Sequence, residues 1–366
     1  MDSRYRSMDY PDVQEIKPMM HSFQYLSLVL LSSITLGACA VSTLEVAPAP
    51  PTLTSAETQL LLPPSPTLPP PAPSQTATIV LTPTAIPEPI ELVDGLGREV
   101  MLPGPAQRIV SLAPSNTEIL FAIGAGSQVV GRDSFSDYPE AAQQITDIGG
   151  GFGELDFETI VSLDPDLVLA AGLTPADQVQ ALADLGITVY LLANPVDFDG
   201  LYYNLRIVAQ LSNHPSEAEQ VISDIQARFD VIMERLAGVE EKPLVFYELD
   251  GTDPNAPWIS GPGTFIDTLI TLAGGINLGR DLEGEWVQIS LEEIIAQDPD
   301  IILLGDAVWG GVTPEAVAAR AGWESLSAVQ KGRVYPFDDN LVSRPGPRLI
   351  AGLEAMAKLL HPELFQ

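Results

Sequence analysis

Two segments of this chain repeat each other at an offset of 134 positions, residues 157–169 and residues 291–303. Each reads as a short helical pattern, then Asp-Pro-Asp, then a run of aliphatic residues. Proline cannot continue a helix, and it disfavours helical geometry in the residue before it. The Asp-Pro-Asp motif therefore ends a helix and precedes a buried strand. We expect two similar lobes, each built of alternating helices and strands.

The remainder of residues 90–366 has the same alternating texture. Short aliphatic runs predict buried strands, and the segments between them have helical spacing. Gly124, Ala125 and Gly126 end the helix that begins near Pro114. Alternation of this kind predicts an α/β fold with parallel sheets covered on both faces. The expected strands are residues 108–112, 129–131, 167–170, 189–192, 244–247 and 301–304.

The stretch between the two lobes is helical in pattern, from about residue 198 to residue 237. Apolar residues recur there at helical spacing, and His214-Pro215 is a natural break in the middle. Residues 215–237 form the second part of this expected connector. A single helical crossing is stiffer than several extended crossings, so we expect small movements between the lobes.

Composition narrows the classes of function. The chain has 366 residues, with 17 Lys and Arg against 49 Asp and Glu, for a net charge of −32. That balance excludes a nucleic-acid binder, which needs clustered basic residues for phosphate contacts. Cys39 is the only cysteine and there are three histidines, so the sequence predicts no disulfide and no metal site built from several imidazoles.

The N-terminal region is typical of an exported protein. Residues 25–36 are an apolar run too short to span a bilayer but suited to a signal peptide. The next residues complete Leu36-Gly37-Ala38-Cys39, which resembles the lipobox of bacterial lipoprotein precursors. That resemblance implies cleavage before Cys39 and acylation of its thiol. The n-region is atypical, and we expect the true start at Met19 or Met20. The alternative is a lone buried cysteine after a short apolar helix.

Residues 40–88 have the composition of a tether. They contain twelve prolines and thirteen Ser and Thr in 49 positions, and neither Lys nor Arg occurs between Pro18 and Gly97. Such a stretch supplies no core and is expected to be extended and partly polyproline. The expected division of the chain is a signal peptide over residues 1–38, the lipidated cysteine and tether over 39–88, an N-terminal α/β lobe over 89–197, a helical connector over 198–240 and a C-terminal α/β lobe over 241–366.

Residues 90–366 resemble the bacterial substrate-binding proteins of importers for cobalamin and ferric siderophores, and within them the cobalamin-binding branch. The segments that carry the resemblance are residues 108–118, Ser136-Asp137-Tyr138-Pro139, the two repeated blocks, Ser260-Gly261-Pro262-Gly263 and Arg344-Pro345-Gly346-Pro347-Arg348. The resemblance implies two Rossmann-like lobes joined by one long helix. It also implies a binding protein and not an enzyme. Consistent with this, the sequence has no nucleophile elbow and no phosphate-binding glycine loop.

The family resemblance assigns two carboxylates to a partner protein. In that family one glutamate on each lobe docks with arginines of the permease dimer, which works with ATPase subunits. Glu158 and Glu292 match these positions and are equivalent in the internal repeat. Glu293 is adjacent to Glu292 and is an alternative docking residue. The ordinary alternative is that each glutamate only caps the first turn of its helix.

The same resemblance places a small-molecule ligand between the lobes, held largely by aromatic rings. An asparagine, Asn340, stands where the cobalamin-binding branch has an aspartate, and Ala171 stands where an aromatic residue is expected. Arg348 is interpreted as structural, with a local carboxylate or backbone partner. The positions assigned to the ligand are Phe135, Phe152, Tyr247, Trp258, Trp286, Asn340 and Arg344.

The expected cargo is a cobalt corrinoid, bound as ligand and not as a cofactor. Ferric hydroxamate siderophores and haem remain alternatives. Anionic ferric catecholates are disfavoured, because Arg344, Arg132 and Arg280 are few cations for so acidic a domain. The chain is expected to be monomeric and extracytoplasmic, held at the membrane through a lipid anchor. An envelope-anchored enzyme or an adhesion module on a stalk is the less favoured alternative.

Overall fold

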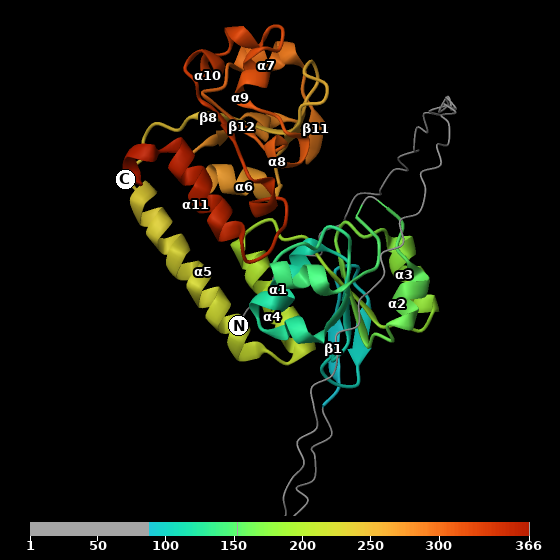
Figure 1. The fold of residues 1–366 in the computed structure, drawn as a ribbon. Helices are drawn as coiled ribbons and strands as arrows, with labels where there is room; N and C mark the ends of the chain where they lie inside the picture. Colours follow the sequence, from blue (N-terminus) through green and yellow to red (C-terminus); the bar gives the residue numbers. More distant parts are fainter. Residues whose placement is uncertain (1–87, 152, 366) are drawn as a thin grey trace, which may run out of the picture. The chain divides into compact units, whose positions relative to one another are not determined.

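The computed structural model describes residues 88–151 and 153–365, all within one compact unit, Val80–Gln366. The predictions about the signal peptide, Cys39, the tether and Phe152 lie outside the described residues. Figure 1 shows two α/β lobes and a long helix, α5, that runs between them.

The N-terminal lobe is built on a five-stranded parallel sheet in the order β5-β4-β3-β6-β7. A short antiparallel hairpin, β1 with β2, precedes it. The strands are β1 (Ile90–Val93), β2 (Glu99–Leu102), β3 (Ile109–Ser111), β4 (Val129–Arg132), β5 (Thr146–Asp147), β6 (Leu167–Ala171) and β7 (Val189–Leu192). The helices of this lobe are α1 (Pro114–Ala122), α2 (Phe157–Ser162), α3 (Ala176–Asp184) and α4 (Phe198–Ser212).

Side-chain alternation in β6 explains why this sheet is covered on both faces. Leu167 and Leu169 point into a core shared with α1 and α4, whereas Val168 and Ala170 pack in a second cluster with residues of α2 and α3. All are fully buried. A strand buried on both sides reads as a continuous aliphatic run, as its sequence does.

The C-terminal lobe is built on a mixed sheet in the order β11-β9-β8-β12-β13, with β10 also paired to β8. Its strands are β8 (Leu244–Asp250), β9 (Trp258–Ser260), β10 (Ile276–Asn277), β11 (Trp286–Gln288), β12 (Ile301–Leu304) and β13 (Val334–Pro336). Its helices are α6 (Phe265–Leu272), α7 (Leu291–Gln297), α8 (Ala307–Gly310), α9 (Pro314–Ala318), α10 (Ser327–Gln330) and α11 (Leu349–Leu360). The α/β fold with two lobes is as predicted from the sequence.

One feature of this second sheet corrects the expectation of purely parallel strands. Strand β9 is antiparallel both to β8 and to β11. Only residues 251–257 join β8 to β9, and a connection that short returns the chain in the opposite direction, because a parallel strand needs a longer crossover. Strand β9 has only three residues and forms no continuous hydrophobic run, so the sequence pattern did not predict it.

The connector consists of two helices with a sharp break between them. Asn213 ends α4 in the left-handed conformation, with φ of 65°, and Pro215 begins α5 (Pro215–Leu236). Proline is favoured at a first helical position because its missing N–H has no partner to lose there. No helix in the described part of the chain combines the length and the apolarity needed to cross a bilayer.

A continuous apolar core links the two lobes through this connector. Phe198 of α4 packs edge-on against Phe229 of α5, with ring centroids 5.3 Å apart, and against Phe265 of α6, at 5.6 Å. The hydroxyl of Thr268, also on α6, donates to the carbonyl of Val196 at 2.8 Å. The junction therefore joins N-terminal lobe, connector and C-terminal lobe in one packed cluster.

The repeated Asp-Pro-Asp motifs end helices α2 and α7 and also brace the sheets. Asp164 and Asp298 both adopt left-handed conformations, with φ of 46° and 50°. Two positions later, Asp166 accepts hydrogen bonds from the backbone N–H groups that precede β3, and Asp300 accepts one from Leu244 at the start of β8, at 2.9 Å. Each motif thus ties the start of one strand to the start of its neighbour.

Candidate functional site

The carboxyl ends of the parallel strands in the two lobes lie on the sides that face each other. Segments that follow β3 and β4 in the first lobe contact segments that follow β13 in the second through side-chain ion pairs. Ligands of α/β proteins bind at the carboxyl ends of strands, where loops are free to diverge. The space between these two edges is therefore the candidate binding cleft.

A buried ion pair crosses the cleft between Arg348 and Glu118. The guanidinium at the start of α11 donates two hydrogen bonds to the carboxylate on α1, from Nε to Oε2 at 2.8 Å and from Nη2 to Oε1 at 2.6 Å. The side chain of Glu118 is 2% exposed and that of Arg348 is 19% exposed. Burial raises the pKa of Glu118 above its usual value, although the hydrogen bond and charge of Arg348 oppose this. The sequence-based expectation of a local partner for Arg348 is wrong, because its partner lies on the other lobe.

A second ion pair joins the lobes beside the first. Arg344 Nη1 lies 2.5 Å from Asp137 Oδ1 and 3.7 Å from Glu118 Oε1. Burial would raise the pKa of Asp137, but the hydrogen bond and positive charge of Arg344 lower it below its usual value. Arg344 thus lies where the two lobes meet, and carboxylates of the opposite lobe neutralise its charge.

The loop after β4 is anchored by a buried chain of hydroxyl groups. Asp133 accepts a hydrogen bond from the Ser136 hydroxyl at 2.7 Å, and Ser136 in turn lies 2.8 Å from the Thr117 hydroxyl. Asp133 also accepts from the backbone N–H of Phe135 at 2.8 Å. Buried polar groups need such partners, so this loop holds one conformation. Its outward side chains include the half-exposed Tyr138, whose ring lies 4.1 Å from the Arg348 guanidinium.

Phe135 on the same loop lies against the glycine-rich turn that follows β5. A Cβ atom built on Gly151 would lie 2.0 Å from the Phe135 ring, and Gly151 has a positive φ of 69°. Only glycine allows the ring to approach this closely. Phe135 is 45% exposed, so the turn holds the ring while one side faces outward.

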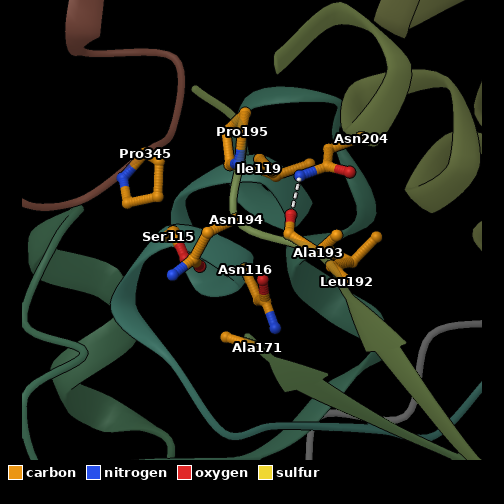
Figure 2. Close-up of a pocket in the computed structure, with 10 residues that line it drawn as sticks. All are labelled: Ser115, Asn116, Ile119, Ala171, Leu192, Ala193, Asn194, Pro195, Asn204 and Pro345. Carbon is orange, nitrogen blue, oxygen red and sulfur yellow. Dashed lines mark hydrogen bonds between the residues drawn. The ribbon is translucent and has the colours of Figure 1, made fainter. Parts of the chain in front are cut away.

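A small hollow lies at the ends of β6 and β7 in the first lobe. Figure 2 shows that asparagine side chains line it and that Pro345, from the loop that carries Arg344, approaches from the other lobe. Asn116 donates to the carbonyls of Leu169 and Ala170, and Asn204 donates to the carbonyl of Ala193 at 2.9 Å. A water-sized sphere has about 0 Å³ of free volume in this hollow, so it is not a ligand pocket in this structure.

Two predicted aromatic residues sit on the antiparallel strands of the second lobe. Trp258 begins β9 and is 41% exposed, and Trp286 begins β11 and is 49% exposed. Trp286 pairs with Ser260 and Gln288 pairs with Trp258, so both indoles project from the same face of the sheet. The turn before Trp286 approaches Gly261 so closely that a Cβ there would lie 1.9 Å from the Gly284 carbonyl oxygen.

A third exposed tryptophan was not predicted from the sequence. Trp309 lies in α8, directly after β12, and is 60% exposed beside Val308 at 62%. Asp306 at the start of this segment accepts from the Gly251 N–H at 2.9 Å and so fixes α8 beside the end of β8. Its position in the sequence could have indicated a site residue, because it follows a predicted strand, β12, whose carboxyl end faces the other lobe.

Two other predicted ligand residues are placed differently from the exposed aromatics. Tyr247 is fully buried in β8, and its hydroxyl donates to Asp339 at 2.7 Å, so it lies in the core and not on the cleft surface. Asn340 lies in the 3₁₀ turn after β13 and donates to Asp338 at 2.9 Å. Burial raises the pKa of Asp339, with the Ser343 and Tyr247 hydroxyls opposing it.

Comparison with known proteins identifies the family. The family described as "Periplasmic binding protein" matches residues 109–341. The chain belongs to the periplasmic binding protein family.

Individual periplasmic binding proteins are similar over most of the chain. The uncharacterized ABC transporter substrate-binding lipoprotein YvrC of Bacillus subtilis (strain 168) is 32% identical over 76% of this chain and 87% of its own. The vitamin B12 binding protein BtuF of Vibrio cholerae is 27% identical, with a TM-score of 0.61 over 72% of this chain and 99% of its own. The haem-binding protein RhuT from Roseiflexus sp. RS-1 is 28% identical, with a TM-score of 0.64 over 71% and 99%.

Family membership settles the general role of this periplasmic binding protein. It is an extracytoplasmic solute-binding protein of an ABC transporter, with a small-molecule ligand and permease and ATPase partners. Proteins of this family bind their solute without catalysis, so the expectation that the chain is not an enzyme is confirmed.

The arginines considered for an anionic ligand all have carboxylate partners. Arg132 Nη1 lies 3.0 Å from Asp147 Oδ2, and Arg280 Nε lies 3.2 Å from Asp281 Oδ2. Arg344 is paired with Asp137, as described above. Within residues 88–151 and 153–365, no group of His, Cys, Asp and Glu side chains is arranged to hold a metal ion.

The two repeat-related glutamates lie on short helices of different lobes. Glu158 is in the first turn of α2 and Glu292 is in the first turn of α7, and both are exposed. In the described part of the chain neither carboxylate forms an ion pair. Glu293, by contrast, accepts a hydrogen bond from Gln297 at 2.9 Å.

Proposed function

We propose that the cargo of this binding protein is a cobalt corrinoid. The observation that carries the proposal is the pairing of Arg344 with Asp137, together with the pairing of Arg132 and Arg280 with their own carboxylates. An anionic chelate would have to compete with these carboxylates for every one of those cations. A neutral or cationic macrocycle has no such cost.

The exposed aromatic residues also support a flat macrocyclic ligand. Phe135, Trp258, Trp286 and Trp309 are exposed, and we assign them to the cleft, where each large ring can bury about 150–250 Å² against a flat ligand. A corrin ring also carries amide substituents, which need hydrogen-bonding partners. Asn340 is compatible with such a ligand, because an amide can pair with an amide.

Haem is the second candidate, and Tyr138 favours it. A phenol oxygen is an established haem-iron ligand, and Tyr138 is 47% exposed in a loop beside Arg348. The two histidines of the described region are poorly placed for this role. His361 is buried, and His214 lies in the connector with Nδ1 2.8 Å from the Ser212 carbonyl.

Ligand titration of the purified chain separates these candidates. We expect saturable quenching of tryptophan fluorescence by cobalamin and cobinamide, and weaker responses to haemin and a ferric hydroxamate. A haemin complex with a Soret band that is lost in Tyr138→Phe, without corrinoid binding, would replace the corrinoid proposal with haem. Tight binding of a ferric hydroxamate alone would replace it with a siderophore.

Two further roles complete the proposed function. Glu158 and Glu292 dock one lobe each onto the two-fold permease, since a carboxylate forms charge-assisted bonds with arginine. Glu292 is preferred to Glu293 because Gln297 already engages Glu293. Charge reversal of Glu158 and Glu292 together should abolish permease binding and leave ligand affinity intact. A loss of affinity instead would place them in the binding site.

Cys39 anchors the chain through a lipid in this proposal, with residues 40–88 as its tether. Cys39→Ser should release the protein from the membrane fraction into the soluble fraction. Continued tight attachment of Cys39→Ser to washed membranes would contradict the lipoprotein assignment.

A further inference from the structure

Helices α2 and α7 present the same outward pattern on two different lobes. Each begins after a side chain that caps it: Asp156 accepts from the Thr159 N–H at 2.9 Å, and Ser290 accepts from the Glu293 N–H at 3.2 Å. Each buries one isoleucine, Ile160 or Ile294, completely. The capping position and the buried anchor fix which face of each short helix points outward.

The outward face of each helix carries a carboxylate, then an aliphatic residue one turn later. On α2 these are Glu158 and Val161, and Val161 is 49% exposed. On α7 they are Glu292 and Ile295, and Ile295 is 39% exposed. Residues three apart lie on the same helix face, so each carboxylate stands beside its aliphatic neighbour.

A small residue completes both faces. Ser162 follows Val161, and its hydroxyl is already bonded to the Thr159 carbonyl at 2.8 Å. Ala296 follows Ile295 in the same register. Both are exposed. Neither position has a bulky side chain that would keep a partner surface away from the aliphatic group.

Repetition distinguishes these two aliphatic residues from scattered exposed ones. A single exposed valine or isoleucine is ordinary on a protein surface. Here Val161 and Ile295 occupy equivalent positions of the internal repeat, each beside an equivalent unpaired carboxylate. A partner that meets both faces in the same way must itself offer two equivalent surfaces, as a two-fold dimer does.

We propose that Val161 and Ile295 are apolar anchors of the surface that docks on the permease dimer. The occupant of each face is one permease subunit, which provides a basic side chain for the glutamate and an apolar contact for its neighbour. Burial of the aliphatic groups excludes water around the carboxylate and strengthens its charge-assisted contact. This inference rests on the proposed docking role of Glu158 and Glu292.

The test compares binding of full-length variants to the purified permease and ATPase complex of the same organism. Val161→Asn with Ile295→Asn should weaken binding by about tenfold or more, through lost apolar burial. Each single change should account for a similar share, because the positions are equivalent. Cobalamin affinity and the melting temperature should stay at their wild-type values. Should the asparagine variants fold poorly, Val161→Thr with Ile295→Thr keeps both side chains β-branched. Val161→Thr then changes only polarity, whereas Ile295→Thr also removes the terminal methyl group.

The matched control is Leu185→Asn, at a residue that is 55% exposed at the end of α3 and has no partner in the repeat. It should bind the importer as the wild type does. Binding within twofold of wild type for the Val161 and Ile295 double variant, with Glu158→Lys and Glu292→Lys still disruptive, overturns the aliphatic anchors alone. Full binding by both double variants overturns the docking proposal as well.

Discussion

Arg348 at the start of α11 holds Glu118 of α1 through two hydrogen bonds of 2.8 and 2.6 Å, from one lobe to the other. The two residues are 230 positions apart in the sequence. With the Phe198 cluster at the connector, it gives the two lobes two separate points of attachment.

Removing one partner of this pair should be strongly destabilising. Glu118→Gln leaves the buried guanidinium unpaired, and loss of one partner of a buried ion pair costs about 3–5 kcal/mol of unfolding free energy. Urea denaturation of the purified chain measures the change. The exposed pair of Arg206 with Glu219 is the control, because Arg206→Gln should cost no more than about 1 kcal/mol. Equal effects at the two pairs would contradict the buried role.

The complementary variant, Arg348→Gln, should make stability depend on pH. Burial raises the pKa of Glu118, and without Arg348 the main opposing influence is gone. An acid whose pKa is raised in the folded state stabilises that state below its unfolded pKa and loses the effect as pH rises through the raised value. Arg348→Gln should therefore be more stable relative to wild type near pH 5 than near pH 8. Glu118→Gln lacks the titrating group, so residue 118 should contribute no pH dependence to its stability over that range.

The contribution of Asp137 to stability should change with pH in the opposite direction to that of Glu118. Although burial alone would raise it, Arg344 lowers the pKa of Asp137 below 3.8. The stabilisation from its charge is present above the unfolded pKa and is lost as pH falls through the lowered value. Carboxyl-carbon NMR should show the midpoint of Asp137 rise in Arg344→Met, because the hydrogen bond and charge that lower its pKa most are then gone. Asp147, whose pKa is lowered by Gly149, Ser134 and Arg132, should keep its midpoint.

The carboxylates of the Asp-Pro-Asp motifs should contribute measurably to stability. Asp300→Ala leaves the Leu244 N–H at the start of β8 without its acceptor, at an expected cost of about 1–3 kcal/mol. Thermal or urea unfolding tests this. Asp184→Ala, which removes an exposed hydrogen bond with Gln180 on α3, should change stability by less than about 0.5 kcal/mol. A null effect at Asp300 would reduce the motif to a helix terminator.

The local sequence pattern predicted those strands and helix ends that depend on neighbouring residues in the chain. Continuous aliphatic runs such as 167–170 and 301–304 became strands buried on both faces, and Pro215 marked the connector break. The partners of Arg344 and Arg348 were beyond such reasoning, because they lie 207 and 230 residues away and depend on how the lobes meet. Strand β13 has one aliphatic residue in three and was not recognised, and the β1-β2 hairpin was missed although both of its strands contain aliphatic residues.

The residues of the candidate site were likewise predicted only in part from the sequence. Trp258 and Trp286 were predicted and are exposed, whereas Tyr247, at the end of an aliphatic run, belongs to the core. The aliphatic run at 244–247 indicated that Tyr247 is buried, and only the family resemblance suggested that it binds the ligand. Trp309 sits in a four-residue helix with no periodic signal, so only its place after β12 reveals it.

The four tryptophans of the chain provide a direct test of the binding surface. Trp323 is fully buried, and its indole N–H donates to the Pro254 carbonyl at 3.0 Å, while the other three are exposed on the second lobe. Trp258→Leu, Trp286→Leu and Trp309→Leu should each lower corrinoid affinity by about 5–30-fold, since one large ring contributes about 1–2 kcal/mol of contact.

Fluorescence in the same titrations distinguishes contact from distortion. Trp323→Phe should lower stability and leave affinity unchanged, because that indole is fully buried, and the fraction of the emission that the ligand quenches should rise. In the variant that lacks the three exposed indoles, the remaining emission comes from Trp323, and an added corrinoid should quench it little. Wild-type affinity in Trp309→Leu, with weakened binding in Trp286→Leu, would restrict the ligand to β9 and β11 and remove α8 from the site.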